Sequence, residues 1–368
     1  MLASLSMTAI DPIVSKELAL LRPALASFHD AAAVAVLGSP VDVVALFVTN
    51  AIPGARVWAV AQTASEVDIL RQLNRSTIET ILASDLPGFD SMVDLAVIRV
   101  GGYEGKENIR RALAFACTHV RSGGAVVVVT HVKRGAKTQM AMLEEICGNA
   151  EILERGSGGF RILQAKPPEG LSSAAPPEDA GMTQIAEEIR GERFEFVTNA
   201  SVFSKDRVDP GSRLLLEIVP DVPVKSILDV GCGYGVMGIV LARRFPDAAV
   251  TMLDIDVGAV ELARRNAERN GVGERTSVIL SDGLRELPGQ RFDLAVIHFP
   301  LHIPKPDLER LLSEIHDALR PGACLYGVML SAYELRTLLR RVFSRVETVH
   351  ETGPEAEYRY AIVRSCRA

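Results

Sequence analysis

Ile227-Leu-Asp-Val-Gly-Cys-Gly-Tyr-Gly235 is the stretch of sequence that decides the fold. It predicts a short apolar strand that carries the acid Asp229 and runs into three alternating glycines, with a helix following over 237–245. Because glycine has no Cβ atom, such a turn lets the backbone bend sharply and lie against a ligand. A strand that enters a glycine turn at the start of a helix is typical of a cofactor site in an α/β fold.

Two kinds of cofactor fit these glycines. Gly233, Gly235 and Gly238 match the dinucleotide fingerprint, and Asp254 stands about 20 residues on, where a ribose-binding acid is expected. The first glycine of that fingerprint should follow the strand directly, however, and here Gly231 does so. An acid just before the turn is unfavourable beside a pyrophosphate but suits a cationic ligand. S-adenosyl-L-methionine carries an ammonium and a sulfonium and no phosphate, so the turn favours this cofactor over a nicotinamide cofactor.

The composition is that of a globular protein. The chain has 368 residues, of which 48% are hydrophobic and 23% charged, and this length allows two domains. No apolar run is long enough for a membrane span, and the N-terminus lacks the basic start of a secretory signal, so we expect a cytoplasmic protein without membrane contact. The net charge of −6 weighs against a surface coated with nucleic-acid-binding charge, but it leaves room for a local basic patch.

The cysteines are scattered and odd in number. We expect them to be small buried apolar residues rather than metal ligands or disulfide partners. They are Cys117, Cys147, Cys232, Cys324 and Cys366.

The chain carries one plan twice. Proline, serine, glycine and acidic residues predict a linker at 167–181, which divides the chain into 1–166 and 182–368. Asp94-Leu-Ala-Val-Ile98 recurs letter for letter as Asp293-Leu-Ala-Val-Ile297, and each half ends in two short strand-like runs. The predicted fold class is α/β, with two tandem Rossmann-like domains that each contain a mostly parallel sheet with an antiparallel edge hairpin.

The two halves differ where chemistry would take place. Opposite the glycine turn, the first half has Ala33-Val-Ala-Val-Leu-Gly-Ser-Pro40, with a single glycine and no acid. Opposite Asp254 it has Ala61. We therefore expect a cofactor in the second half alone, and we interpret the first half as a degenerate copy that serves as a scaffold or recognises the substrate.

On these residues the chain resembles the tandem-domain ribosomal RNA guanine-N2 methyltransferases, which pair a degenerate N-terminal domain with an active C-terminal one of the class I methyltransferase fold. Asn199-Ala-Ser-Val-Phe-Ser-Lys-Asp-Arg-Val-Asp-Pro-Gly-Ser-Arg-Leu-Leu216 looks like the segment that covers the cofactor in that family, and Lys133–Lys137 is a weaker match. The resemblance implies an S-adenosyl-L-methionine-dependent enzyme that methylates the exocyclic amine of a guanine in ribosomal RNA and uses no metal.

The resemblance also implies roles for the acids of the second half. Asp229 would lie near the methionine part of the cofactor, Asp254 would accept hydrogen bonds from the ribose hydroxyls, and Asp282 would bind the adenine amine; Asp256 also fits a plain helix cap. The predicted cofactor-binding residues are Asp229, Gly231, Gly233, Gly235, Asp254, Ile255, Asp282 and Gly283. The predicted substrate residues are Phe203, Lys205, Phe299 and Lys305.

The catalytic motif departs from the family pattern. Where the family has Asn-Pro-Pro-aromatic, commonly followed by histidine, this chain has His298-Phe-Pro-Leu-His302. The predicted catalytic residues are His298, Pro300 and His302, and Phe299 could replace the missing stacking ring. A neutral histidine still accepts one hydrogen bond, as the family's asparagine does, but it can also act as a general base. A methyltransferase for a small-molecule oxygen or nitrogen acceptor, with His298 as base, therefore stays open, as does a non-catalytic cofactor-binding protein.

Two further expectations concern loops and basic residues. The prolines of 303–306 predict a stiff loop at the mouth of the substrate site. Lys133, Arg134 and Lys137 form the best candidate for contact with RNA phosphates, whereas the arginine pairs at 243–244, 264–265 and 340–341 lie on predicted helices and are expected to face solvent.

Overall fold

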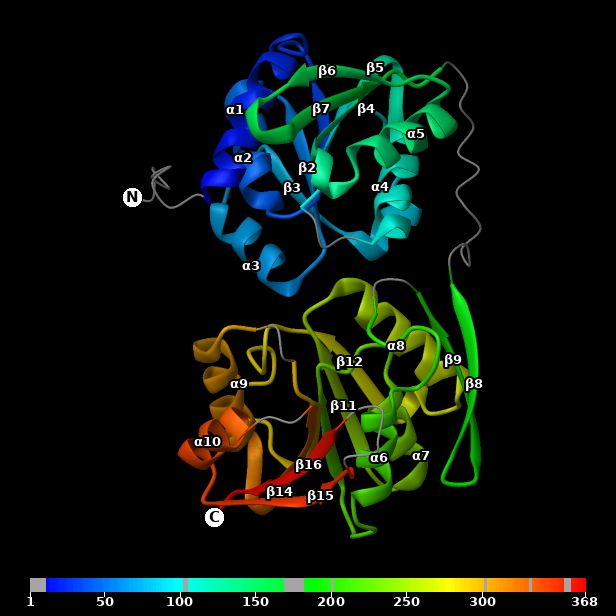
Figure 1. Ribbon diagram of the computed structural model, residues 1–368, viewed down its shortest axis with the longest axis vertical. Coiled ribbons are helices and arrows are strands. Elements are labelled where there is room, and N and C mark those ends of the chain that lie inside the picture. The colour runs from blue at the N-terminus through cyan, green and yellow to red at the C-terminus, as the bar shows by residue number, and fades with distance from the viewer. Residues whose placement is uncertain are drawn as a thin grey trace. The chain divides into compact units, whose positions relative to one another are not determined.

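The computed structural model describes residues 11–101, 105–168, 182–199, 202–300, 303–330, 333–353 and 359–368. The chain folds into two compact units, drawn in Figure 1. Unit 1 comprises Met1–Gln62 and Glu66–Ala180, and unit 2 comprises Thr63–Ser65 and Gly181–Ala368. Each unit contains a seven-stranded sheet with helices packed against it.

From α1 in unit 1 and from α6 in unit 2, helices and strands follow in nearly the same order, and unit 2 begins with an additional two-stranded hairpin, β8–β9. The elements of unit 1 are α1 (Pro12–Ala26), β1 (Ala33–Leu37), α2 (Val41–Ala51), β2 (Arg56–Ala61), α3 (Ala64–Leu73), β3 (Ile78–Leu82), β4 (Val93–Arg99), α4 (Lys106–His119), β5 (Val120–His131), α5 (Ala136–Cys147), β6 (Glu151–Arg155) and β7 (Phe160–Ala165). Those of unit 2 are β8 (Thr183–Ile189), β9 (Glu192–Thr198), α6 (Pro210–Ile218), β10 (Ser226–Val230), α7 (Val236–Arg244), β11 (Ala249–Asp254), α8 (Val257–Arg269), β12 (Thr276–Leu280), β13 (Phe292–His298), α9 (Lys305–Ala318), β14 (Leu319–Leu330), α10 (Tyr333–Val342), β15 (Arg345–Glu351) and β16 (Tyr360–Cys366).

The strand order is the same in the two sheets. It is β3-β2-β1-β4-β5-β7-β6 in unit 1 and β12-β11-β10-β13-β14-β16-β15 in unit 2. The first five strands of each order are parallel, and β7 and β16 run antiparallel to both of their neighbours. The prediction of a duplicated, mostly parallel sheet with an antiparallel edge pair is confirmed.

The repeated pentapeptide has the same structural role in both units. Asp94 and Asp293 begin the two copies, and each carboxylate accepts hydrogen bonds from two successive backbone N–H groups where the neighbouring strand starts. Each carboxylate also pairs with an arginine at the start of the next strand along the sheet. The partners, at 2.8 to 3.0 Å, are Ala32, Ala33 and Arg121 for Asp94, and Lys225, Ser226 and Arg320 for Asp293. The acid therefore satisfies backbone donors that would otherwise lack a partner at the amino end of each sheet.

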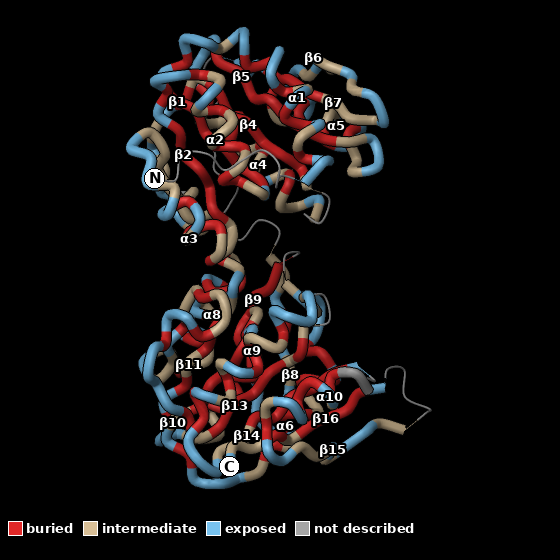
Figure 2. Tube along the Cα trace, turned by 90° about the vertical axis from the view of Figure 1, so that its left-hand side faces the viewer, coloured by how far each residue is buried: buried red, intermediate tan, exposed pale blue. Residues whose placement is uncertain are grey.

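The core of each unit lies along its central strands, as Figure 2 shows. All five residues of β1 are buried, and so are four of the five residues of β10. Strands that are covered on both faces contain continuous apolar runs, which explains why the sequence shows no alternation there.

The structure corrects the expectation for four of the five cysteines. Cys117 pairs with Cys147, and Cys324 pairs with Cys366, whereas Cys232 is a buried thiol as expected. The partners are 30 and 42 residues apart in sequence. Tertiary packing of α4 against α5, and the register of β14 against β16, bring them together, and spacing alone carries no signal for either contact.

The predicted stiff loop at 303–306 is also corrected. Helix α9 begins at Lys305, with a proline in its first turn, where the missing N–H costs nothing.

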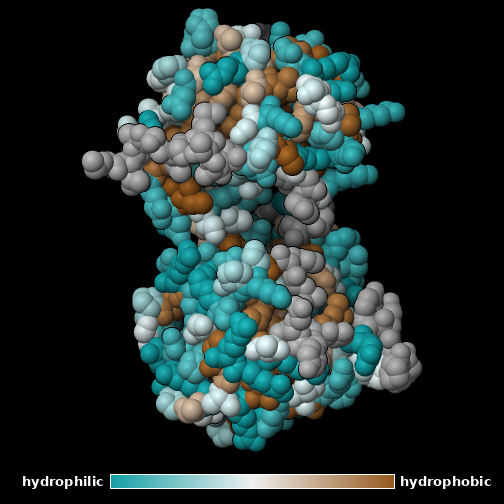
Figure 3. All heavy atoms as spheres, turned by 60° about the vertical axis from the view of Figure 1, so that its left-hand side comes forward, coloured by the Kyte–Doolittle hydropathy of each residue, from teal (hydrophilic) through white to brown (hydrophobic). Residues whose placement is uncertain are grey.

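In the described part of the chain no helix is long and apolar enough to cross a membrane. The face in Figure 3 is mostly hydrophilic, with hydrophobic side chains gathered in small groups.

Candidate functional site

The carboxyl ends of β10, β11 and β13 meet at one edge of the sheet in unit 2. The chain leaves β10 for β11 on one side, whereas β13 lies on its other side, so the strand order reverses at β10. In open α/β sheets ligands bind at such a point, outside the carboxyl ends of the strands. Asp229, Asp254 and His298 lie at these three strand ends, so the structure brings these predicted site residues together.

The glycine turn between β10 and α7 is open on one side. Gly231 and Gly233 have φ angles of 68° and 56°, which L side chains rarely adopt, and a Cβ atom added at either would meet no atom within 4 Å. A hydrogen bond joins the turn to the neighbouring strand β11, because the amide of Cys232 donates to the carbonyl of Leu253 at 2.9 Å. This geometry fits a ligand lying directly against the backbone.

Asp229 is fully buried beneath the turn. Its Oδ2 accepts a hydrogen bond from the Gly238 amide at 2.7 Å, whereas its Oδ1 has no partner among the described residues. Burial, together with the nearby charge of Asp254, raises the pKa of Asp229 to about 7. A buried carboxyl oxygen without a partner is costly. A cationic group above the turn would stabilise the ionised form, so this observation fits a ligand that carries an ammonium.

Asp254 connects the end of β11 to the glycine turn. Its Oδ2 accepts from the Gly233 amide at 2.8 Å, and its Oδ1 accepts from the Asp256 amide at 3.0 Å. Burial raises the pKa of Asp254. Ile255 follows with an exposed side chain, as expected for a residue that covers a planar ring. Asp256 caps α8 by accepting from the Ala259 amide at 2.8 Å, which confirms its interpretation as a helix cap.

Asp282 lies in an ion cluster that sequence reasoning missed. Its carboxylate contacts Arg310 at 2.7 Å and Arg285 at 3.2 Å. Glu314 pairs with Arg310 at 2.7 Å and accepts from the Leu284 amide at 2.9 Å, so α9 holds the loop that follows β12. The spacing of Arg310 and Glu314, four residues apart on a helix, was the available signal.

Gly283 belongs to the same loop and is tightly packed. A Cβ atom at this position would lie 2.2 Å from Oε2 of Glu314. Gly283 therefore serves the packing of this loop against α9, and no open space borders it on that side.

His298 ends β13 and faces the start of α6. Its Nδ1 lies 3.0 Å from Oγ of Ser212 and 3.5 Å from Oδ2 of Asp209. The ring of Phe203 meets the histidine ring edge-on, with centroids 5.3 Å apart. Burial lowers the pKa of His298, although the charge of Asp209 acts in the opposite direction. The imidazole is therefore neutral at pH 7 and has one nitrogen that can accept a hydrogen bond.

Asp209 and Ser212 are functional candidates that sequence reasoning missed. Asp209 is buried as the N-cap of α6, where its Oδ2 accepts from the Ser212 amide at 2.8 Å. Its Oδ1 accepts from the Tyr360 hydroxyl at 3.1 Å. The Asp-Pro pair before the helix was the available signal, but it predicts only a cap.

The predicted substrate residues fall into different environments. Phe203 is 68% exposed beside His298, and Lys205 is exposed and pairs with Asp206 at 2.7 Å. Lys305 lies in the first turn of α9. Phe299 is only 2% exposed and packs in the core against Gly327, so the prediction that its ring contacts the substrate is wrong.

Strand alternation explains the burial of Phe299. Phe299 alternates with His298 along the strand end, which turns its ring to the other face of the sheet. Pro300 follows directly, and Leu301 and His302 lie outside the described residues.

Asn266 fastens the glycine turn to the preceding hairpin. This buried side chain of α8 accepts from the Val197 amide at 2.7 Å and donates to the carbonyls of Val197 and Tyr234, both at 2.9 Å. The turn, β9 and α8 are thereby joined by one fully satisfied amide.

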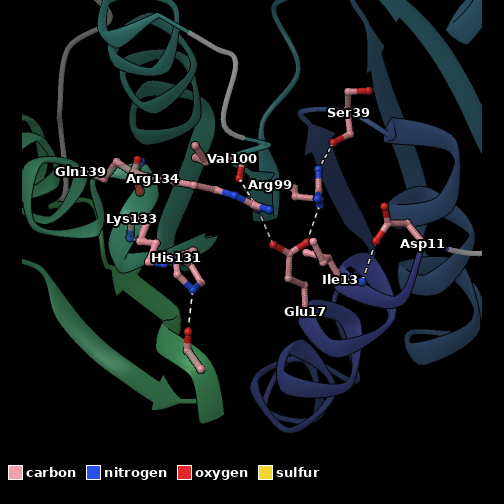
Figure 4. A network of polar contacts seen from close by, with 11 residues as sticks. Asp11, Ile13, Glu17, Ser39, Arg99, Val100, His131, Lys133, Arg134 and Gln139 are labelled. Carbon is pink, nitrogen blue, oxygen red and sulfur yellow. Dashed lines mark hydrogen bonds and ion pairs between the residues drawn. The ribbon is translucent and has the colours of Figure 1, made fainter. Parts of the chain in front are cut away.

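The corresponding place in unit 1 is closed. A Cβ atom added at Gly38 would lie 1.9 Å from the carbonyl oxygen of Arg99, the last residue of β4. Figure 4 shows Glu17 of α1 between Arg99 and Arg134, and its carboxylate contacts the Arg99 guanidinium at 2.8 Å. β2 ends in Ala61, as β11 ends in Asp254, so the acid is missing as well.

The basic residues have mostly structural roles. Arg134 is turned toward Glu17, which corrects its predicted contact with RNA, whereas Lys133 and Lys137 are exposed. Three arginines that were expected to face solvent bind backbone carbonyls of unit 2 instead. They are Arg243, Arg244 and Arg264.

Comparisons with known proteins agree with this arrangement. The family model of the methyltransferase small domain matches residues 193–359. Ribosomal RNA small subunit methyltransferase C of Pseudomonas putida (strain W619) is 30% identical over 240 residues, which cover 63% of this chain and 69% of that relative. The uncharacterized protein YbxB of Bacillus subtilis (strain 168) is 47% identical over 85 residues, which cover 23% of this chain and 42% of that relative.

A solved structure shares the fold over nearly the whole chain. The T. thermophilus 16S rRNA N2 methyltransferase in complex with AdoMet and guanosine aligns with a TM-score of 0.81 and 22% identity, covering 98% of this chain and 93% of that one. This likeness confirms the predicted fold, two tandem α/β units that each contain a mostly parallel sheet with an antiparallel edge pair. Taken with the sequence relatives, it establishes that the chain belongs to the ribosomal RNA small subunit methyltransferase C family.

Proposed function

We propose that unit 2 binds S-adenosyl-L-methionine and transfers its methyl group to the exocyclic amine of a guanine in ribosomal RNA. Three features at one edge of the sheet carry this proposal. They are the open glycine turn, the buried Asp229, whose Oδ1 has no partner among the described residues, and the neutral His298. A protein that acts on ribosomal RNA would work in the cytoplasm, so we include a cytoplasmic location in the proposal.

Each acid of unit 2 has a separate part in holding the cofactor. The buried carboxylate of Asp229, beneath the glycine turn, attracts the ammonium of the methionine part of the cofactor. The backbone of Gly231 and Gly233 lies against this same part of the cofactor. Each carboxylate oxygen of Asp254 accepts one backbone hydrogen bond, from Gly233 or Asp256, and has a further lone pair. These lone pairs accept hydrogen bonds from the ribose hydroxyls. Asp282, aligned by Arg310, accepts from the adenine amine, and Ile255 covers the ring.

The acceptor lies at the end of β13, against His298 and Phe203. When bound, the cofactor supplies a methyl group that is already activated on a sulfonium. The protein therefore contributes mainly alignment rather than acid–base catalysis. His298 accepts a hydrogen bond from the target amine, and the exposed ring of Phe203 stacks on the base, in place of the aromatic residue that the motif lacks.

Unit 1 contributes recognition rather than chemistry. Its turn at Gly38 is packed against Arg99, and its second strand ends without an acid, so we assign no cofactor to it. The exposed amines of Lys133 and Lys137 fit contact with RNA phosphates, as a small local patch on an acidic protein.

A methyl-transfer assay tests this function. The protein is incubated with S-adenosyl-L-methionine labelled in its methyl group and with ribosomal RNA that lacks the modification, and the RNA is digested to nucleosides. We expect label in N2-methylguanosine. Transfer to no RNA at all would remove the substrate from the proposal while leaving cofactor binding to be measured by calorimetry, with a nicotinamide cofactor as the comparison.

A second candidate is methylation of a hydroxyl on a small molecule, with His298 as general base. The contact of His298 with Asp209 favours it, because a carboxylate beside an imidazole increases its basicity. His298→Asn separates the two. An amine acceptor keeps most of its rate, since asparagine also accepts a hydrogen bond. A hydroxyl acceptor loses about 100-fold or more, since asparagine cannot take a proton.

A further inference from the structure

We propose that Asp209 is a positioning residue that fixes the tautomer of His298, so that Nδ1 carries the proton and Nε2 presents its lone pair to the acceptor amine. This inference rests on the proposed function for the identity of the acceptor. The tautomer itself is a property of the free protein and can be measured without any reaction.

The contacts of Asp209 leave its charge facing the histidine. Oδ2 is fixed by the Ser212 amide at 2.8 Å, and Oδ1 is fixed by the Tyr360 hydroxyl at 3.1 Å. The carboxylate is buried and does not rotate freely, so Oδ2 stays 3.5 Å from Nδ1 of His298. Asp209 has no arginine or lysine partner among the described residues that could neutralise its charge.

A proton on Nδ1 is the arrangement that this charge favours. An Nδ1–H group donates to Oγ of Ser212 at 3.0 Å and points its positive end toward Asp209. In the other tautomer a lone pair on Nδ1 would face the carboxylate, which is repulsive. The serine hydroxyl can serve either tautomer, so Asp209 decides between them.

Nε2 is consequently the accepting atom. It has no hydrogen-bond partner among the described residues, and the edge-on ring of Phe203 limits rotation of the imidazole. Burial keeps the pKa of His298 below its ordinary value, so the ring stays neutral and keeps this lone pair. Among the described groups that titrate, Asp209 faces the ring from the N-cap of α6, and Tyr360 of β16 contacts the other oxygen of Asp209.

An Nε2 lone pair replaces the accepting oxygen of the asparagine that the family motif would place here. The equivalent residue of unit 1 does not have this capacity. Arg99 ends β4 as His298 ends β13, and it also meets an acid of the first helix, Glu17. A guanidinium has donors only, so the same juxtaposition yields an acceptor in unit 2 alone.

Nuclear magnetic resonance of protein labelled with ¹⁵N in its histidines tests the tautomer directly. The signals of His298 are identified by their loss in His298→Asn. We expect a protonated Nδ1 and an unprotonated Nε2 at pH 8, and a loss of this preference in Asp209→Asn. A protonated Nε2 in the unaltered protein would overturn the inference, whether or not any substrate is methylated.

A double-mutant cycle tests the consequence for transfer. Asp209→Asn should lower kcat about tenfold or more with little change in KM, and it should change kcat less than about twofold in the His298→Asn background, where there is no tautomer to fix. Equal losses in the two backgrounds would mean that Asp209 acts only as a helix cap. Asp11→Asn is the control, because Asp11 also caps a helix directly before a proline and contacts no histidine among the described residues.

The pH profile provides a readout that a cap alone would not change. Protonated histidine has two donors and no acceptor, so kcat should fall on the acid side with the pKa of His298. Asp209→Asn removes the charge that raises this pKa, so the acid limb should move to lower pH. An acid limb that stays in place would contradict the coupling. Thermal melting of each variant confirms that it is folded.

Discussion

Oδ2 of Asp254 accepts a hydrogen bond from the Gly233 amide at 2.8 Å, so the end of β11 and the glycine turn are one connected structure. Asp254→Ala should therefore weaken binding of S-adenosyl-L-methionine about 10- to 100-fold, because two ribose hydrogen bonds and this link are lost together. Calorimetric titration gives the dissociation constant. Asp247→Ala, which removes an exposed acid of the same unit, is the control and should leave it unchanged. An unaltered affinity in Asp254→Ala would contradict the assignment.

Asp229 should make stability fall as pH rises. Its pKa is raised from the ordinary 3.8 to about 7 in the folded protein, so its contribution is fully present below about pH 4 and is lost as the pH rises through about 7. Asp229→Asn keeps an acceptor for the Gly238 amide but cannot ionise. Relative to the unaltered protein, the variant should gain on the order of 4 kcal/mol of unfolding free energy between pH 4 and pH 9.

Denaturant unfolding at several pH values measures this difference. Saturating S-adenosyl-L-methionine should shrink it, because a cation beside Asp229 stabilises the ionised form. Parallel pH profiles of the two proteins would show that Asp229 keeps its ordinary pKa.

Phe203 should contribute to binding of the RNA rather than of the cofactor. Its ring is exposed beside His298, and loss of one base-stacking contact costs about 1–3 kcal/mol, so Phe203→Ala should raise KM for RNA roughly 5- to 100-fold. Phe203→Trp should restore most of the loss. The dissociation constant of S-adenosyl-L-methionine serves as the internal control, and a change in that constant instead would place Phe203 over the cofactor.

Glu17 should stabilise unit 1 without affecting cofactor binding. Glu17→Gln leaves Arg99 without its buried counter-charge, and breaking such a pair costs about 3–5 kcal/mol. Denaturant unfolding should show the loss, while the affinity for S-adenosyl-L-methionine stays the same. Glu145→Gln, at an exposed pair with Arg110, is the matched control and should change stability little. A loss of cofactor affinity in Glu17→Gln would contradict a cofactor site confined to unit 2.

Much of the fold follows from the sequence because its signals are local. The strand that carries Asp229, the glycine turn and the helix after it are set by adjacent residues, and the repeated pentapeptide at Asp94 and Asp293 reveals the duplication. The start of α9 at Lys305 was not predicted, because proline both breaks helices and begins them. The disulfides were missed because Cys324 and Cys366 meet only through the register of two strands.

The site was less accessible to prediction, because side-chain partners come from distant elements. Asp229 and Asp254 could be found from their places at strand ends. Asp209 contacts His298 across 89 positions of sequence, and no spacing rule connects a helix cap to a strand end. Phe299 was assigned to the substrate on its residue type alone, whereas strand alternation turns its ring into the core.

The packing of Gly38 against Arg99 limits how unit 1 could be redesigned. To hold a cofactor as proposed for unit 2, unit 1 would need space above its turn, an acid in place of Ala61 and a new partner for Arg99. These are changes at three separate places, so no single substitution would give unit 1 the site of unit 2. Glu17 and Arg99 form a buried ion pair at the strand end where unit 2 has Asp209 and His298, so a redesign of unit 1 would have to begin by replacing this pair.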